Sequence, residues 1–224
     1  IAVDVDSDTV SKKSVMYAKN ETIINECLQY VVSTLTPDEA VDSILAYIGK
    51  TFHCDRTYIF EMHDTTAVNT YEWCRDGVSP QKDLLQDIHT SSLQWWLDIF
   101  EQGQVVIIKD IEDIRTTHPT SYAILKPQNI QTLTAGPIRM GDRIMGFIGV
   151  DNPDNDKLHL VASLFKVLSC FMVSLLRRRD LLRRLNTMSF RDSLTGAFNR
   201  NALFDRYGSP WNGYSLGVVF CDVT

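Results

Sequence analysis

The fold of this protein is decided in residues 54–62, which read CDRTYIFEM. Within this stretch and the residue after it, Tyr58, Phe60 and Met62 alternate with Ile59, Glu61 and His63. A period of two is typical of a β-strand whose faces have different environments. A second run of this type, Val68–Trp73, follows after the short polar segment Asp64-Thr65-Thr66. The sequence therefore predicts an antiparallel hairpin here.

Three further strands are expected towards the C-terminus, at Val105–Ile108, Thr132–Met140 and Arg143–Asp151, the last two joined by a tight turn at Gly141-Asp142. A short helix with apolar positions at helical spacing precedes them and ends near Gly103. Strands that follow one another through short turns, with helices between some of them, indicate an α+β domain with an antiparallel sheet flanked by helices.

Long helices are predicted at both ends of this domain. Apolar side chains in Val10–Leu35 recur every three or four residues, as on one face of an amphipathic helix. Thr36-Pro37-Asp38-Glu39 then has the pattern of a new helix start, with Thr36 and Glu39 as a capping box. Another helix begins at Leu158.

The C-terminal helix shows a heptad pattern once Arg178 is included: Leu164, Leu168, Phe171, Leu175, Leu182 and Leu185. Its flanks are rich in charge: Arg177, Arg179, Asp180, Arg183 and Arg184. We predict that this helix pairs with a second copy in a homodimer. The alternative is a helix that lies on its own sheet, as its first two turns are expected to do. Contact of the arginines with anionic lipid or nucleic acid is the less favoured interpretation.

The composition is that of an ordinary soluble protein. The 224 residues carry a formal net charge of −6, which argues against a nucleic-acid surface over the whole molecule. Five scattered cysteines without a C-x-x-C pair predict reduced thiols in a cytoplasmic protein, and His53, Cys54, His63 and Cys74 fit no closed zinc pattern. The sequence shows no signal peptide and no apolar run of the roughly 18 residues that span a bilayer, although a membrane anchor upstream of Ile1 stays open.

Four stretches, 54–61, 70–74, 136–138 and 146–151, together resemble a GAF domain, and the similarity extends from about Ala18 to Leu176. The resemblance implies a small-molecule sensor and dimerisation module with an unknown ligand. Candidate pocket aromatics are Tyr58, Tyr71, Trp73, Trp95 and Trp96. No GAF cofactor is evident, because no cysteine has a bilin-attachment context and the cyclic-nucleotide motif of some GAF domains is missing. His89 and His118 can ligate haem in principle, but surface histidines are far commoner.

A second motif, SFRDSLTGAFNR, occupies residues 189–200. It resembles the D-x-L-T-G-x-x-N-R signature that opens the GGDEF, or diguanylate cyclase, domain, and the matching positions are Asp192, Leu194, Thr195, Gly196, Asn199 and Arg200. The residues themselves predict a turn, with Asp192 and Thr195 bonded to backbone, Gly196 relaxing it and Asn199 starting a helix that runs to about Tyr207. The chain is thus expected to contain the truncated start of an α/β GGDEF domain.

The apolar stretch Ser215–Val223 ends in a carboxylate, Asp222. The resemblance implies that Asp222 and the Val223 carbonyl bind Mg²⁺ on the phosphates of GTP, although an aspartate that caps a turn is the plainer interpretation. Many family members read Asp-Ile-Asp here, whereas this chain reads Asp222-Val223-Thr224. Since the sequence stops at Thr224, before the GGDEF loop, we expect this piece alone to be inactive.

The expected organisation is a linker (1–17), a GAF sensor (18–157), a helical linker (158–188) and the GGDEF start (189–224). The favoured function is the sensory region of a bacterial diguanylate cyclase that makes cyclic di-GMP from two GTP molecules. The alternative is a ligand-binding and dimerisation module attached to a degenerate GGDEF domain that binds GTP without turnover. A sensor histidine kinase is disfavoured, because Phe190 stands where its phosphoacceptor histidine would be expected.

Overall fold

The structure is a computed structural model, and it describes residues 21–33, 36–192 and 194–207. The chain divides into two compact units, Ile1–Arg178 and Arg179–Thr224. Each unit is described by itself below.

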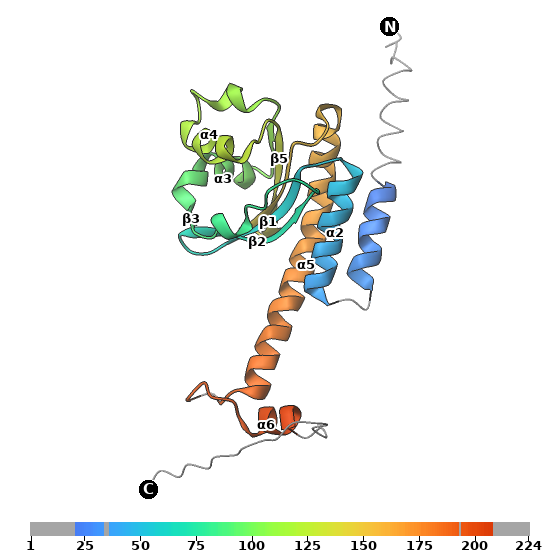
Figure 1. The fold of residues 1–224 in the computed structure, drawn as a ribbon, viewed down its shortest axis with the longest axis vertical. Helices are drawn as coiled ribbons and strands as arrows, with labels where there is room; N and C mark the ends of the chain where they lie inside the picture. Colours follow the sequence, from blue (N-terminus) through green and yellow to red (C-terminus); the bar gives the residue numbers. More distant parts are fainter. Residues whose placement is uncertain (1–20, 34–35, 193, 208–224) are drawn as a thin grey trace. The chain divides into compact units, whose positions relative to one another are not determined.

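The first unit is built on a six-stranded antiparallel sheet with the order β3-β2-β1-β6-β5-β4 (Figure 1). Its strands are β1 (Arg56–Met62), β2 (Thr66–Cys74), β3 (Ile88–His89), β4 (Val106–Ile108), β5 (Leu133–Met140) and β6 (Arg143–Asp151). The hairpin β1–β2 and the hairpin β5–β6 meet at the centre, because β1 pairs with β6 along most of its length.

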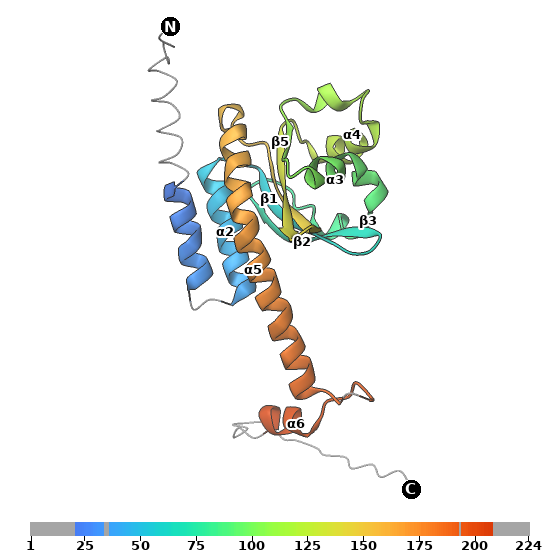
Figure 2. The same cartoon turned by 180° about the vertical axis from the view of Figure 1, so that it is seen from behind.

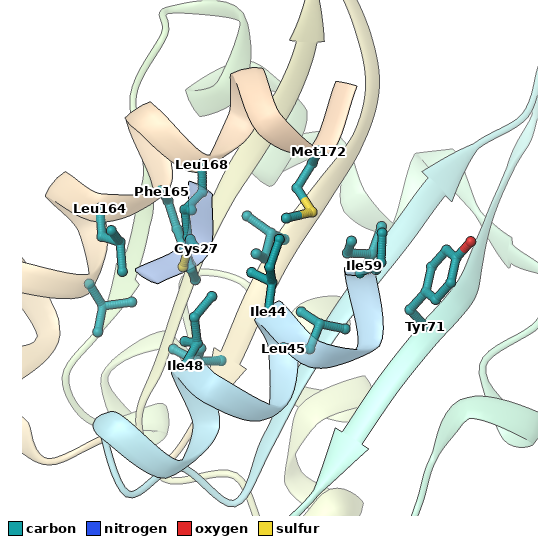
Figure 3. Packing of buried hydrophobic residues seen from close by; sticks show 14 of the residues in the cluster. Cys27, Ile44, Leu45, Ile48, Ile59, Tyr71, Leu164, Phe165, Leu168 and Met172 are labelled. Atoms are coloured by element: carbon teal, nitrogen blue, oxygen red, sulfur yellow. The ribbon is translucent and has the colours of Figure 1, made fainter. Parts of the chain in front are cut away.

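One face of this sheet is covered by α2 (Pro37–Thr51) and by the first part of α5 (Leu158–Phe190), and the helical residues 21–32 lie beyond them, farther from the sheet, in the opposite views of Figures 1 and 2. Their side chains and those of the sheet form one apolar cluster, part of which Figure 3 shows. Ile44 and Ile48 of α2 and Leu164 and Leu168 of α5 are completely buried in it. This cluster is the main core of the unit.

The other face carries α3 (Gln94–Glu101) and α4 (Pro119–Leu125), as well as short 3₁₀ helices at Lys82–Leu84, Thr90–Leu93, Ile111–Ile114 and Lys126–Gln128. A fifth 3₁₀ helix, Asn155–Lys157, directly precedes α5. A second apolar cluster, rich in aromatic rings, lies between α3, α4 and the sheet. The sheet therefore separates two cores.

The start of α2 follows from its first four residues. The Thr36 Oγ1 accepts a hydrogen bond from the Glu39 amide at 3.3 Å, and the Glu39 carboxylate accepts one from the Thr36 amide at 2.8 Å. Pro37 occupies the first turn, where its missing N–H costs nothing. The predicted capping box is confirmed.

The predicted strands and helices of this unit are present, with bounds that differ by a few residues. The two-residue strand β3 and the 3₁₀ helices were not predicted, because segments this short show no hydrophobic period. Of the helix predicted over Val10–Leu35, residues 21–32 are helical. Its remaining residues, apart from Ser33, lie outside the described part of the chain.

Helix α5 has two different surroundings along its length. Leu164, Leu168 and Leu175 of the heptad pattern are buried against the sheet side of their own domain. Beyond Leu176, apolar side chains are exposed: Leu181, Leu182, Leu185 and Met188. By length and composition α5 could cross a membrane, but the burial of its apolar side makes a core helix the better interpretation.

The second unit contains the end of α5, a turn and α6 (Arg200–Tyr207). The Asp192 Oδ1 accepts hydrogen bonds from the amides of Leu194 and Thr195, at 3.2 and 2.9 Å, and from the Thr195 hydroxyl at 2.8 Å. Gly196 has φ +68°, in the left-handed region that glycine adopts without strain. The Asn199 Oδ1 accepts from the Ala202 amide at 3.1 Å, so that Asn199 caps α6 as the sequence predicts.

We expect Leu164→Ala to lower the free energy of unfolding by about 2–5 kcal/mol, because it opens a cavity in the core. Leu182→Ala, the same change at an exposed position of the same helix, should cost less than about 0.5 kcal/mol in the monomer. Urea denaturation of the two variants at low protein concentration measures both values. Equal losses would contradict the packing of α5 described above.

Candidate functional site

A cavity of about 40 Å³ lies between the sheet and the helices α3 and α4. Most of its lining is apolar, and the polar lining residues come from the two central hairpins and from the segment that carries α4. The lining residues are Tyr58, Phe60, Asn69, Glu72, Leu85, Ile88, Leu93, Trp96, Ser121, Ile124, Leu125, Gln128, Ile130, Phe147 and Asp151. Apolar walls with a few polar groups are typical of small-molecule sites.

A buried ion pair lies at one side of this cavity. The Arg56 Nε donates a hydrogen bond to the Asp151 Oδ2 at 2.8 Å, and the Tyr58 hydroxyl donates one to the Asp151 Oδ1 at 3.0 Å. Arg56 and Asp151 are 3% and 0% exposed. They are neighbours because β1 and β6 are paired with Arg56 opposite Asp151.

The same guanidinium binds two loops. The Arg56 Nη1 donates to the Ser79 carbonyl at 3.2 Å, and the Arg56 Nη2 donates to the Gln128 carbonyl at 2.9 Å. Ser79 lies in the segment after β2, whereas Gln128 ends the 3₁₀ helix after α4. Arg56 thus holds together chain segments that lie far apart in the sequence around the cavity.

Burial raises the pKa of Asp151 to about 6, although Arg56 and Tyr58 act in the opposite direction. Burial also lowers the pKa of the Arg56 guanidinium. The charge and the hydrogen bond of Asp151 have a larger opposite effect, so the pKa of Arg56 is raised. The pKa of Tyr58 is raised by burial and by the Asp151 charge, so its hydroxyl stays protonated and donates. At neutral pH the cluster is an ion pair with a neutral tyrosine.

The second carboxylate of the cavity, Glu72, is also bound by the protein. Its Oε2 accepts hydrogen bonds from the amides of Gln81 and Lys82, at 2.8 and 3.0 Å. These bonds fix the start of the 3₁₀ helix Lys82–Leu84 beside β2. Both acidic side chains therefore bind groups of the protein that surround the cavity.

Trp96 differs from these residues because its indole N–H has no hydrogen-bond partner within the described structure. The ring is 3% exposed and is held between Phe100 and Phe147, with centroid distances of 6.4 and 5.5 Å. Phe147 in turn stacks on Phe60 at 4.8 Å. A buried donor without an acceptor is rare in folded proteins and costs free energy.

Of the five aromatic residues that the sequence suggested for a ligand pocket, two line the cavity and three lie elsewhere. Tyr58 and Trp96 line the cavity. Tyr71 and Trp73 pack on the opposite, helix-covered face: the Tyr71 hydroxyl donates to Asp38 of α2, and the Trp73 ring lies directly over Gly49. Trp95 does not belong to the cavity lining, and its ring contacts His118 at a centroid distance of 3.7 Å.

The two histidines that the haem alternative named make local contacts. The His89 Nδ1 accepts a hydrogen bond from the Ser91 amide at 3.3 Å and caps the following 3₁₀ helix. The His118 ring contacts the Trp95 ring. Among the described residues no group of three or more histidine, cysteine or acidic side chains is placed to hold a metal ion. Asp222 and Val223, the predicted Mg²⁺ ligands, lie outside the described residues.

Sequence reasoning missed Arg56 and Asp151. Both stand in apolar strand segments, and a charged side chain at such a position is the one signal that could have indicated them. Their pairing spans 95 residues of sequence. Nothing in the local pattern reveals that separation.

The arrangement of the sheet and its flanking helices has counterparts among known proteins. The family model of the GAF domain matches residues 36–169, more than half of the chain. The chain belongs to the GAF domain family. The match includes every strand of the sheet, together with α2 and the beginning of α5.

Solved structures agree in fold. The GAF domain of an Acinetobacter phosphoenolpyruvate-protein phosphotransferase is similar with a TM-score of 0.56 at 10% identity, over 74% of this chain and 98% of that one. The phycoerythrobilin-bound GAF domain of a cyanobacterial phytochrome gives 0.56 at 12% identity, over 73% and 97%. The blue-light absorbing form of the Thermosynechococcus elongatus PixJ GAF domain gives 0.51 at 15% identity, over 68% and 92%.

One curated relative is the methanogenesis regulatory histidine kinase FilI of Methanothrix harundinacea. It is 30% identical over 125 residues, which are 51% of this chain but only 13% of the kinase. The similarity concerns a small part of a much longer protein. It associates this GAF domain with a regulatory, signal-transducing relative.

We expect Arg56→Met and Asp151→Leu each to lower the free energy of unfolding by about 3–5 kcal/mol, because each leaves a buried charge without its partner. In the double variant the loss should be smaller than the sum of the single losses by about 2 kcal/mol or more. Chemical denaturation of the four proteins gives this coupling. Strictly additive losses would show that the two charges do not depend on each other.

Proposed function

We propose that this chain is the sensory GAF region, and the beginning of the catalytic domain, of a cytoplasmic bacterial diguanylate cyclase. In this proposal the cavity beside Tyr58 and Trp96 binds a regulatory small molecule, and the domain that begins at residue 189 makes cyclic di-GMP from two GTP molecules. The family match and the regulatory relative support the sensory part. The sequence signature supports the cyclase part.

The observation that carries the cyclase proposal is the attachment of the signature turn to the end of α5. The Asn199 Nδ2 donates hydrogen bonds to the carbonyls of Ser189 and Arg191, at 2.9 and 3.4 Å. The Asn199 amide donates to the Phe190 carbonyl at 2.9 Å, and Arg191 and Phe198 form an antiparallel bridge. A rotation of the helix end would therefore carry the turn with it.

Arginine and aromatic contacts reinforce this attachment. The Arg191 Nη1 donates to the Gly196 carbonyl at 2.7 Å, and its guanidinium lies 4.6 Å from the centre of the Phe198 ring. Such a cation–π contact at an exposed site is worth about 0.5–1 kcal/mol. The signature residues thus have a structural task in the turn besides any role in a complete catalytic domain.

A homodimer through α5 is part of the proposal. Cyclic di-GMP synthesis joins two GTP molecules, and one way to achieve this is for two catalytic domains each to present one. Leu182 and Leu185, the last two positions of the heptad pattern, are exposed, as on a helix that pairs with a partner. Binding in the cavity would then act by shifting the pairing of these helices.

The second candidate is a degenerate GGDEF domain that binds GTP without turnover. Its support is the sequence Asp222-Val223-Thr224, which departs from the Asp-Ile-Asp of many family members. The name of the histidine kinase relative gives no reason to prefer kinase chemistry, because the similarity covers 13% of that protein. Phe190 also stands where a phosphoacceptor histidine would be expected.

The decisive experiment incubates the full-length protein that contains this chain with GTP and Mg²⁺ and measures cyclic di-GMP. We expect product, and we expect Asp222→Ala to abolish it, because the carboxylate would be a ligand of the metal on the phosphates. GTP binding without product, in a folded dimer, would favour the degenerate domain. Product that survives Asp222→Ala would contradict the assigned metal ligand.

The dimer has a separate test in the double variant Leu182→Ser/Leu185→Ser, which changes the two exposed positions of the heptad pattern. Because these side chains are already exposed in the monomer, the change should leave thermal stability at high dilution nearly unaltered while it moves the protein from dimer to monomer. Light scattering after size-exclusion chromatography measures the mass. The pair Ser174→Ala/Lys166→Ala on polar exposed positions of α5 is the control. A parent protein that is monomeric at high concentration would refute pairing through α5.

A further inference from the structure

We propose that the cavity takes a small organic cation, an ammonium group on a short apolar body, and that Glu72 and Asn69 hold the ammonium at the mouth of the cavity. This ligand class rests on the proposed sensory function, since it specifies the ligand of the same cavity. It does not depend on the identity of the catalytic domain. The shape of the cavity, its charge and one buried acceptor support the proposal.

The cavity has an apolar floor and a half-open mouth. The lining side chains that are only half-buried, and therefore border on solvent, are Glu72, Leu85, Ile88, Ile124 and Gln128. Most of the deeper lining is apolar and buried: Phe60, Leu93, Trp96, Leu125, Ile130 and Phe147. The volume of about 40 Å³ leaves room for a body of only a few carbon atoms. A compact ligand fits this shape if its apolar end points inwards and its polar end lies at the mouth.

The cavity carries an excess of negative charge. The described lining residues include two carboxylates, Glu72 and Asp151, and no basic side chain. Asp151 has its counter-ion in Arg56, whose Nε lies 2.8 Å from the Asp151 Oδ2. Glu72 forms no ion pair with any residue that the structure describes. Because Glu72 is half-buried, water screens its charge only in part, and the mouth favours a cation over an anion.

The Asn69 side chain, which is 1% exposed, adds an acceptor beside this charge. One end of its amide lies 2.9 Å from the Tyr71 carbonyl and 3.3 Å from the Ile59 carbonyl, and the other end lies 3.3 Å from the Glu72 Oε1. The Nδ2 belongs at the first end, because an oxygen there would be repelled by both carbonyls. The opposite orientation would offer only one long bond, to Glu72. The Asn69 Oδ1 therefore faces the Glu72 Oε1.

Two oxygens that both accept hydrogen bonds thus lie side by side in β2, on residues that line the cavity. The other Glu72 oxygen, Oε2, already accepts from the amides of Gln81 and Lys82. A contact between two acceptors is unfavourable unless a donor bonds to them. An ammonium group carries three N–H donors and a positive charge, so it can bond to both oxygens and compensate the charge of Glu72.

The test compares four small molecules: isobutylammonium, methylammonium, isobutanol and isovalerate. Isobutanol and isovalerate keep the branched apolar body but are neutral and anionic, whereas methylammonium keeps the charge and loses most of the apolar body. Binding is followed in a ¹H–¹³C methyl spectrum of the labelled protein. Ile88, Ile124 and Ile130 report on the cavity, and Ile44 and Ile48 report on the core across the sheet.

We expect isobutylammonium to shift the signals of the three cavity isoleucines in a saturable way and to leave Ile44 and Ile48 nearly unchanged. It should bind about tenfold more tightly than isobutanol, the difference that one charge-assisted hydrogen bond makes at a half-exposed site. It should also bind at least about tenfold more tightly than methylammonium, because its apolar body leaves water. Isovalerate should bind more weakly than isobutanol. Added salt should weaken the binding of isobutylammonium but not that of isobutanol.

Glu72→Gln removes the charge but keeps an oxygen for the two backbone amides, and its new amide can donate to the Asn69 Oδ1. This variant should bind isobutylammonium no more tightly than isobutanol. Asp87→Asn is the matched control, because Asp87 is exposed, carries the same charge and does not line the cavity. It should keep the preference of the parent protein.

The proposal would be overturned if isobutanol, isovalerate or methylammonium bound the parent protein as tightly as isobutylammonium, or if no probe bound in a saturable way. Methyl shifts outside the cavity instead of within it, or an unchanged preference in Glu72→Gln, would also overturn it. The comparison of the probes on the parent protein decides the matter even if Glu72→Gln does not fold.

Because the readout is a resonance and not turnover, a protein without cyclase activity can still confirm the ligand class. An active cyclase whose cavity ignores isobutylammonium would refute the ligand class alone.

Discussion

The structure depends on one buried interaction, the ion pair between Arg56 and Asp151. Removing two charges from water is costly, and a buried pair persists only where further hydrogen bonds satisfy both groups. Here the Asp151 carboxylate also accepts a hydrogen bond from the Tyr58 hydroxyl. The Arg56 guanidinium also donates to the carbonyls of Ser79 and Gln128. One interaction therefore joins the two central strands, two loops and a wall of the cavity.

The position of Asp151 gives this interaction a functional meaning. Asp151 ends β6 and lines the cavity, and α5 begins seven residues later at Leu158. Asn152, in the left-handed region at φ +51°, accepts from the amides of Gln131 and Thr132 and so fixes the path of the connection. A change in the cavity thus has a short covalent route to the start of the helix that we propose as the output element.

The sheet itself was predictable, because its strands alternate or form apolar runs and short polar segments separate the two strands of each central hairpin. The capping box of α2 and the turn around Asp192 were also predictable, because their hydrogen bonds join residues that are close in the sequence. The face to which each aromatic residue points was not predictable. The β1–β2 pairing shifts between Ile59 and Phe60, where Ile59 is opposite Tyr71 but Phe60 is opposite Asn69. Asn69 and Glu72 consequently line the cavity although they are three residues apart, whereas Tyr71 and Trp73 face the helices. A strict period of two misses such a bulge.

The measurement that tests this account most directly is amide hydrogen exchange of Arg56→Met beside the parent protein, under conditions in which both are folded. If Arg56 holds the loops at the cavity, exchange should accelerate in the segments around Ser79 and Gln128 and stay nearly unchanged in α2. Arg75→Met, which removes an exposed arginine paired with Asp55, should leave both loops as they are. Unchanged exchange in the two loops of Arg56→Met would contradict the central role of the buried pair.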